Sequence, residues 1–210
     1  MKENSSNIHS YLSTFRIETL EDGVFGIAMT LLVLNLKIPE KLDKSLFMAI
    51  INIWPNLVTF FGSFILLGVY WLGHRTALHY IKHGDHIFHW FNIILLMFVS
   101  IVPFSSSLIA KYYYDQTAII IYGINLIAIG TTMFLQWCYA TYNYRLIDEE
   151  LPKWIIRYAK IRTIFAPLAY FLAIIISFFS CTMSLALYTI VPILYILPIL
   201  LPIWKSVAEK

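Results

Sequence analysis

The chain has 210 residues, of which 60% are apolar and only 13% are charged. Soluble domains average about 45–50% apolar and about 25% charged residues, and disordered chains are less apolar still. This composition excludes a water-soluble enzyme with a single core as well as a disordered chain, and it predicts an integral membrane protein. The net charge of +3 is small and no basic run resembles a nucleic-acid-binding stripe, so we expect no nucleic-acid partner.

Apolar stretches without charge predict an all-α fold with six transmembrane helices, because one crossing needs about 20 residues. The first 15 residues are polar, so we expect no cleaved signal peptide. The uncharged stretch 163–204 is too long for one crossing, and the polar segment 180–184 divides it. The predicted helices occupy about residues 16–36, 46–79, 87–110, 116–144, 160–180 and 184–204. The connections between the predicted helices are too short to fold alone. We therefore expect residues 1–210 to form one six-helix transmembrane domain without an internal repeat.

The distribution of lysine and arginine predicts the orientation, because these residues are retained on the cytoplasmic side of short-looped membrane proteins. If both termini are cytoplasmic, eleven of the 15 basic residues lie on the inner side. The other four, on the outer side, are Lys37, Lys41, Lys44 and Lys111. We therefore expect a multi-pass protein of the cell (plasma) membrane with both termini in the cytoplasm.

The first predicted helix begins with four ionisable residues within seven positions, namely Arg16, Glu18, Glu21 and Asp22. Charges on a membrane helix are costly unless they are paired or hydrated, so these residues are functional candidates. Arg16 is the only cation near the three acids on this helix, so at least one acid needs a partner elsewhere. A hydrated helix end at the cytoplasmic interface is the alternative, and it suits Asp22 least because we expect Asp22 to lie deepest.

The second half of this helix carries an apolar stripe, because Ile27, Leu31 and Leu34 follow one another at intervals of four and three residues. Thr30 lies on the adjoining edge of the stripe. Such a stripe is typical of core packing or lipid contact, and its periodicity alone does not distinguish these from a pore lining. The helix also has three small residues at which another helix could approach closely: Gly23, Gly26 and Ala28.

Two blocks of sequence carry recognisable motifs. The first is Arg-x-x-x-Leu-Glu-Asp-Gly-Val-Phe over residues 16–25, followed by Ile-Ala-Met-Thr-Leu-Leu-Val-Leu over 27–34. The second includes Trp71-Leu-Gly-His74-Arg75 and Trp90-Phe-Asn92. Together they resemble the first three helices of the transmembrane protein 175 family of potassium channels. The resemblance implies a six-helix homotetramer whose first helices line a central pore, so the partners are three further copies of the chain and membrane lipid.

The resemblance also implies roles for individual residues. Ile27, Leu31 and Leu34 would form the pore constriction, and Thr30 matches a threonine implicated in coordinating the ion. Arg16 and Asp22 would tie the first helix to its neighbours, with Trp71, His74 and Asn92 as polar partners. The chain departs from the family pattern at Leu20 and Glu21, where the family has Phe and Ser. We expect Glu21 to add a ring of acids near the cytoplasmic mouth, where it would concentrate cations.

A ring of apolar side chains can gate by dewetting, since a narrow apolar constriction excludes water and ions. The chain contains no Thr-Val-Gly-Tyr-Gly filter. We therefore predict passive potassium conduction with modest potassium-over-sodium selectivity. Potassium is the permeant species, and we expect no catalytic residue, no bound metal and no cofactor.

A cluster of histidines leaves a second interpretation open. Five of the six histidines lie between His74 and His89, and four of them would form one stripe of metal ligands on an unbroken helix. This spacing would suit a metal-dependent membrane enzyme or a coupled ion transporter. Gly84 and Asp85 interrupt the stripe, however, and they predict a turn between the second and third helices.

Overall fold

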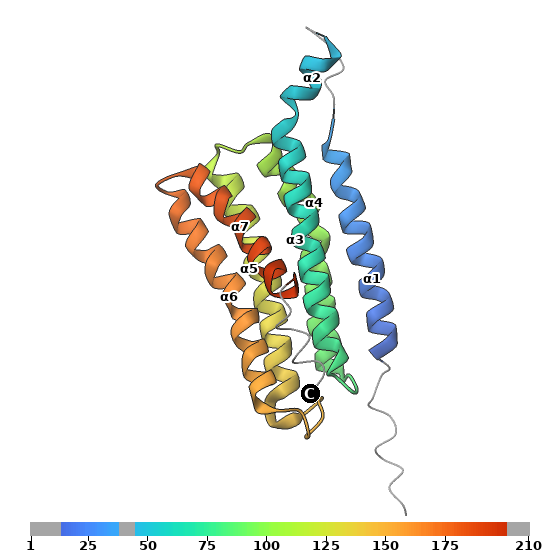
Figure 1. The fold of residues 1–210 in the computed structure, drawn as a ribbon. Coiled ribbons are helices and arrows are strands. Elements are labelled where there is room, and N and C mark those ends of the chain that lie inside the picture. Colours follow the sequence, from blue (N-terminus) through green and yellow to red (C-terminus); the bar gives the residue numbers. More distant parts are fainter. Residues whose placement is uncertain (1–13, 38–44, 201–210) are drawn as a thin grey trace, which may run out of the picture.

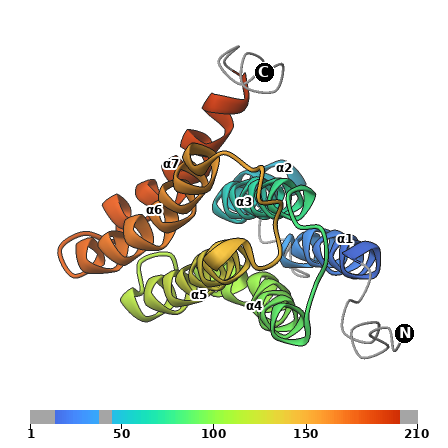
Figure 2. The same cartoon turned by 90° about the horizontal axis from the view of Figure 1, so that it is seen from below.

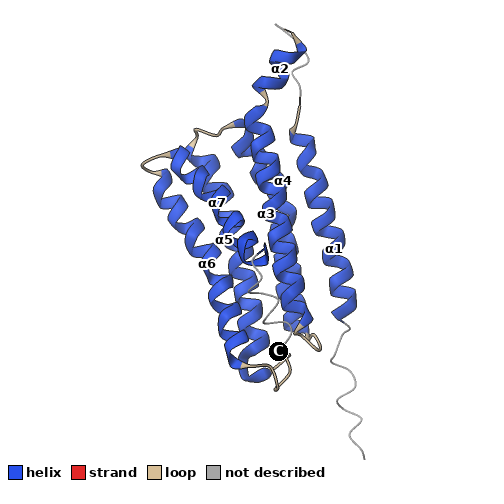
Figure 3. Ribbon diagram, viewed as in Figure 1, coloured by secondary structure: helices blue, strands red, loops and turns tan. Residues whose placement is uncertain are grey.

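The computed structural model describes residues 14–37 and 45–200, which are entirely helical apart from turns and one isolated bridge between Ile81 and Ile147 (Figures 1 and 3). The elements in chain order are α1 (Thr14–Leu31), the 3₁₀ helix η1 (Leu32–Asn35), α2 (Leu46–Asn52), α3 (Trp54–His79), α4 (His86–Lys111), α5 (Gln116–Thr141), the 3₁₀ helix η2 (Tyr142–Tyr144), α6 (Lys153–Ser177) and α7 (Cys181–Leu200).

The long helices run side by side as a bundle, with α1 at one edge and α6 with α7 at the other (Figures 1 and 2). Helix α1 packs against α3 and α4, α4 packs against α5, and α5 packs against α6. The main core lies between these helices and includes Phe25 of α1, Leu67 of α3, Val99 of α4 and Leu126 of α5, all at most 1% exposed. The core therefore fixes one face of α1 against the rest of the chain.

Four helical segments of the described chain are long and apolar enough to cross a membrane: 54–79, 86–111, 116–144 and 153–177. The shorter segment 181–196 of α7 is also apolar. Helices 87–110 and 116–144 were predicted with nearly their observed bounds. Of the predicted helix 184–204, residues 201–204 lie outside the described residues, as do Lys41 and Lys44.

Three predicted helix boundaries are wrong. The predicted helix 46–79 is broken at Ile53 into α2 and α3, because Pro55 occupies the first turn of a new helix, where its missing N–H costs nothing. Helix α6 begins at Lys153 and not at 160, because the helix continues beyond its apolar part into turns that carry charged residues, among them Lys153 and Arg157. The last two helices are separated at 178–180 and not at 180–184, and the Ser180 hydroxyl accepts from Met183 N at the start of α7.

Candidate pore helix and its buried polar network

Helix α1 has one buried and one exposed face. The buried face consists of Ile17, Glu21, Phe25, Ala28 and Leu32, which recur every three or four residues and are at most 4% exposed. This face packs against α3 and α4. Because an α-helix has 3.6 residues per turn, the residues between these buried positions point away from the bundle.

The predicted apolar stripe lies on the exposed face of α1. Ile27 is 61% exposed, Leu31 41% and Leu34 61%, the last at the 3₁₀ continuation η1. These side chains therefore do not belong to the core of their own chain. A Cβ added to Gly23 or Gly26 would meet nothing within 4 Å among the described residues. The two glycines thus serve no close helix contact within the chain, and this face is open to lipid or to another copy.

Thr30 is also exposed, and its hydroxyl donates to the Ile27 carbonyl at 2.9 Å. This bond uses the only hydroxyl proton of the side chain. The lone pairs of Oγ1 therefore remain available as acceptors on the exposed face of α1. An oxygen atom with free lone pairs and no free proton can coordinate a hard cation such as potassium, but it cannot donate a hydrogen bond to an anion.

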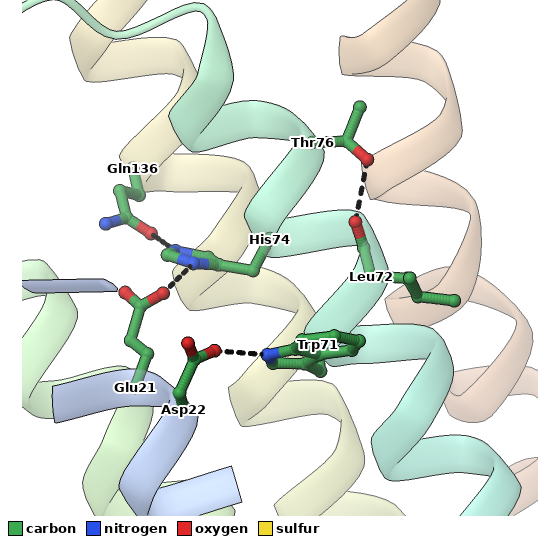
Figure 4. A network of polar contacts seen from close by, with 7 residues as sticks. All are labelled: Glu21, Asp22, Trp71, Leu72, His74, Thr76 and Gln136. Carbon is green, nitrogen blue, oxygen red and sulfur yellow. Dashed lines mark hydrogen bonds and ion pairs between the residues drawn. The ribbon is translucent and has the colours of Figure 1, made fainter. Parts of the chain in front are cut away.

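Asp22 and Trp71 connect α1 to α3. The indole Nε1 of Trp71 donates to Asp22 Oδ1 at 2.7 Å, and the Arg75 guanidinium lies 5.3 Å from the centre of the Trp71 ring (Figure 4). Asp22 itself is exposed. The bond therefore sits at the surface of the chain, beside the exposed face of α1.

The acid of α1 that is buried within the chain is Glu21, which is only 3% exposed. Its Oε2 lies 2.8 Å from His74 Nδ1, and His74 Nε2 lies 2.7 Å from Gln136 Oε1. The three side chains form a continuous buried row from α1 through α3 to α5 (Figure 4). Since the Gln136 oxygen only accepts, His74 Nε2 donates to it.

The expectation that Glu21 adds a ring of acids at a pore mouth is wrong, since its carboxylate points into the chain towards His74 (Figure 4). Two buried atoms of the network, Glu21 Oε1 and Gln136 Nε2, have no hydrogen-bond partner among the described residues.

The remaining predicted members of the network are not joined to it. Arg16 is exposed, and within the described chain no ion pair holds it to a neighbouring helix. Asn92 on α4 is 2% exposed, and its Oδ1 has no hydrogen-bond partner in the part of the chain that the structure describes. Gln136 takes part although no sequence signal indicated it, because it lies 62 residues from His74 in an otherwise apolar segment.

The far end of α1 is anchored by a second polar contact that the sequence did not reveal. Asn35 Nδ2 donates to the Pro103 carbonyl of α4 at 3.2 Å, and Asn56 Nδ2 donates to the Asn35 carbonyl at 3.2 Å. These bonds hold η1 against α3 and α4. Helix α1 is thus tied to the bundle near both ends, and the stripe lies between the two anchors.

A sequence model of the family described as "Endosomal/lysosomal potassium channel TMEM175" matches residues 16–103. A potassium channel of Chamaesiphon minutus is 31% identical over 190 residues, which cover 88% of this chain and 94% of that relative. The chain belongs to the TMEM175 family.

Further relatives agree with membership of the TMEM175 family. A potassium channel of Streptomyces collinus is 28% identical, over 86% of this chain and 90% of the relative. The crystal structure of a lysosomal potassium-selective channel TMEM175 homolog from Chamaesiphon minutus matches with a TM-score of 0.78 and 30% identity, covering 88% of this chain and 97% of that one. Because these relatives are named potassium channels, the TMEM175 family is one of ion channels and not of enzymes.

The histidine stripe that supported the alternative is absent from this TMEM175 chain. Helix α3 ends at His79 and α4 begins at His86, so the histidines are divided by a turn, as Gly84 and Asp85 predicted. Asp85 caps α4 by accepting from Phe88 N at 2.9 Å. No group of three or more histidine, cysteine or acidic side chains gathers into a possible metal site within the described residues.

Proposed function

We propose that this chain conducts potassium passively across the membrane as a homotetramer in which four copies of α1 surround a central pore. The proposal is carried by the exposed face of α1, which presents Ile27 and Leu34 at 61% exposure on a helix whose opposite face is fixed in the core. A chain of the TMEM175 family with an unburied apolar stripe needs either lipid or copies of itself to cover it. Four stripes that meet on one axis would form an apolar pore.

The constriction would consist of rings of Ile27, Leu31 and Leu34. Such rings carry no charge and offer no hydrogen bonds, so a narrow pore excludes water and a wide one admits a hydrated cation. The three residues occupy successive turns of α1 and η1. The barrier would therefore extend over about two turns of helix.

Selectivity would come from the oxygen atoms beside this barrier. Thr30 Oγ1 accepts freely because its proton is given to the Ile27 carbonyl. A single ring of hydroxyl oxygens replaces only part of the hydration shell of an ion. We therefore expect potassium to be preferred over sodium only modestly.

The helix lengths support six crossings with both termini in the cytoplasm. Helix α1 with η1 has 18 and four residues, which extend about 35 Å, and the 20 residues of α7 extend about 30 Å. Both match a hydrocarbon core of about 30 Å. Together with the four longer spans they give an even number of crossings. This number agrees with the distribution of basic residues, because seven lie within 75–82 and 145–162, in and beside the α3–α4 and α5–α6 connections, and four lie at the opposite ends of the helices.

The substitution Ile27→Asn tests the constriction. An amide in the apolar ring retains water, so potassium flux into vesicles that contain the purified variant should rise several-fold over wild type. The matched control is Leu168→Asn, which places the same side chain at an apolar residue of α6 that is 60% exposed and does not contact α1. It should leave the flux unchanged.

Unchanged conductance and selectivity in Ile27→Asn would show that Ile27 does not form the constriction. An equal rise in Leu168→Asn would attribute the effect to a general loosening of the bundle. Intact protein of the same oligomeric state must be recovered for both variants, since the comparison concerns the flux per channel.

A further inference from the structure

An apolar cavity of about 440 Å³ is lined by residues of α3, α5, α6 and α7. Helices α6 and α7 lie on the side of the bundle away from α1 (Figure 2). The volume of the cavity falls in the range of roughly 300–1,000 Å³ that is usual for ligand sites. Along α6 its lining extends from Trp154 to Tyr170, which corresponds to about 24 Å. The cavity is therefore long enough for an extended chain of methylene groups and nearly all of its lining is apolar or aromatic.

One end of the cavity has the character of a membrane interface. Trp154, Tyr158 and Tyr80 line it there, close to the first residue of α6 and the last residue of α3. Tryptophan and tyrosine are enriched at the level of the lipid headgroups. The cavity thus extends from the headgroup level on the α3–α4 loop side, which we propose to be cytoplasmic, towards the middle of the bilayer.

Among the residues that the structure describes, Arg162 is the one charged residue that lines this cavity. Its guanidinium lies 5.4 Å from the centre of the Tyr195 ring, and within the described residues it has no ion pair and no hydrogen bond through its side chain. Helix side chains lean in general towards the N-terminus of their helix, which for α6 is the Trp154 end of the cavity. A cation at membrane depth is costly without a counter-ion, and its usual partner is an anion in the same site.

We propose that this cavity binds an anionic phospholipid, with one acyl chain in the apolar part and the phosphate paired with Arg162. The apolar walls match the chain, and the unpaired guanidinium matches the phosphate, to which arginine binds in a bidentate manner. Basic pockets between transmembrane helices on the cytoplasmic side are suited to such headgroups. The acyl chain of a zwitterionic lipid would occupy the same cavity, but its headgroup would compensate the charge of Arg162 only partly.

The test uses lipids with brominated acyl chains, which quench tryptophan on contact, because Trp137 and Trp154 both line the cavity. The full-length protein is reconstituted in phosphatidylcholine with increasing fractions of brominated phosphatidylglycerol or brominated phosphatidylcholine. Wild type should show additional quenching by phosphatidylglycerol at low mole fraction. Arg162→Gln should weaken this preference about tenfold or more, whereas Arg162→Lys should retain part of it.

Arg157→Gln is the matched control, because Arg157 is an exposed arginine of the same helix that does not line the cavity. It should keep the preference for phosphatidylglycerol. Equal losses in the two Gln variants would mean that only general surface charge attracts the lipid, and equal quenching of wild type by both lipids would exclude an anionic site. If removal of residues 201–210 were required before either lipid quenched, that segment would be the occupant, and the proposal would be wrong.

Discussion

The contact between Glu21 and His74 joins two ionisable side chains that are both nearly inaccessible to solvent. A buried pair contributes little net stability, but the removal of one partner leaves the other desolvated and unpaired. Gln136 fixes the imidazole from its other side and therefore keeps Nδ1 directed at the carboxylate. The network thus determines how α1 is rotated relative to α3, and with it the direction in which the exposed stripe points.

Glu21→Ala should therefore destabilise the protein strongly, by roughly 3–5 kcal/mol, because it leaves His74 without its partner. Replacement of both residues, as Glu21→Ala with His74→Leu, should recover part of this loss. The melting midpoint in detergent measures both effects. Glu18→Ala, three residues away on the same helix and less buried, should change it little. If Glu18→Ala lowered the melting midpoint as much as Glu21→Ala, the contact between Glu21 and His74 would have no special role in stability.

Thr30 provides the second prediction for a single residue. Thr30→Val keeps the shape of the side chain but removes the free oxygen, so the potassium-to-sodium permeability ratio should fall towards one. Thr30→Ser retains a hydroxyl and should keep most of the ratio. Reversal potentials under two-ion gradients give the ratio directly. If Thr30→Val kept the wild-type value, the hydroxyl would have no part in selectivity.

The helix connections on the proposed cytoplasmic side are held together by charged groups outside the membrane spans. Asp85 accepts from the Tyr139 hydroxyl at 2.5 Å, and Arg145 Nε lies 3.4 Å from the same carboxylate. Lys82 pairs with Asp148 in the same region. These contacts join the α3–α4 turn to the end of α5 and the connection that follows it. The two halves of the bundle are therefore braced at one end.

Burial raises the pKa of the Asp85 carboxyl, but hydrogen bonds from Tyr139 and Phe88 and the charge of Arg145 lower it more, so the pKa lies below its ordinary value. The stability that this carboxylate contributes is present above the unfolded pKa of about 3.9 and is lost as the pH falls through the lower folded pKa. Asp85→Asn should thus melt several degrees below wild type at pH 7.

The difference between wild type and Asp85→Asn should begin to shrink below about pH 4, where the unfolded carboxylate takes up a proton, and it should close once the pH lies below the lower folded pKa. Glu149→Gln is the control, since it removes an exposed acid from the same loop region without an ion pair among the described residues. It should melt like wild type at pH 7. If the difference in melting midpoint between wild type and Asp85→Asn did not change with pH, the charge of Asp85 would not be the cause of that difference.

At the scale of the whole molecule, the exposed stripe of α1 leaves the protomer with an apolar face beside glycines that meet no neighbour. Small residues allow close approach between helices of different chains. The polar network lies on the opposite side of α1, within one chain (Figure 4). The proposed tetramer would therefore assemble from rigid protomers whose pore-facing surfaces are already aligned.

This arrangement predicts cross-linking across the symmetry axis. In a background that lacks the two free cysteines, Cys138 and Cys181, Ile27→Cys should oxidise to covalent dimers, because in the proposed tetramer the copies of residue 27 would converge on the axis. Leu168→Cys, equally exposed but on α6, should remain monomeric on a denaturing gel. Equal cross-linking at both positions would place the stripe of α1 away from the axis.

Much of the fold follows from local sequence. Helices 87–110 and 116–144 and the turn at Gly84 and Asp85 could be anticipated from hydropathy and turn residues. The start of α6 at Lys153 and the helix break before Pro55 could not be predicted. Neither charge nor length shows whether a helix continues beyond its membrane span. Gln136 and Asn35 escaped notice since isolated amides in apolar stretches carry no local pattern.

The sequence by itself determined that the chain lies in a membrane, that it is helical and to which family its first helices are similar, because these depend on composition and on neighbouring residues. Only the tertiary structure decided that Glu21, and not Asp22, is the buried acid of α1. The two residues are adjacent, and a rotation of about 100° between them separates the core from the surface. The rotation of α1 is set by the contacts of Glu21 with His74, 53 residues away, and of His74 with Gln136, 62 residues further on. No local sequence pattern can therefore predict it.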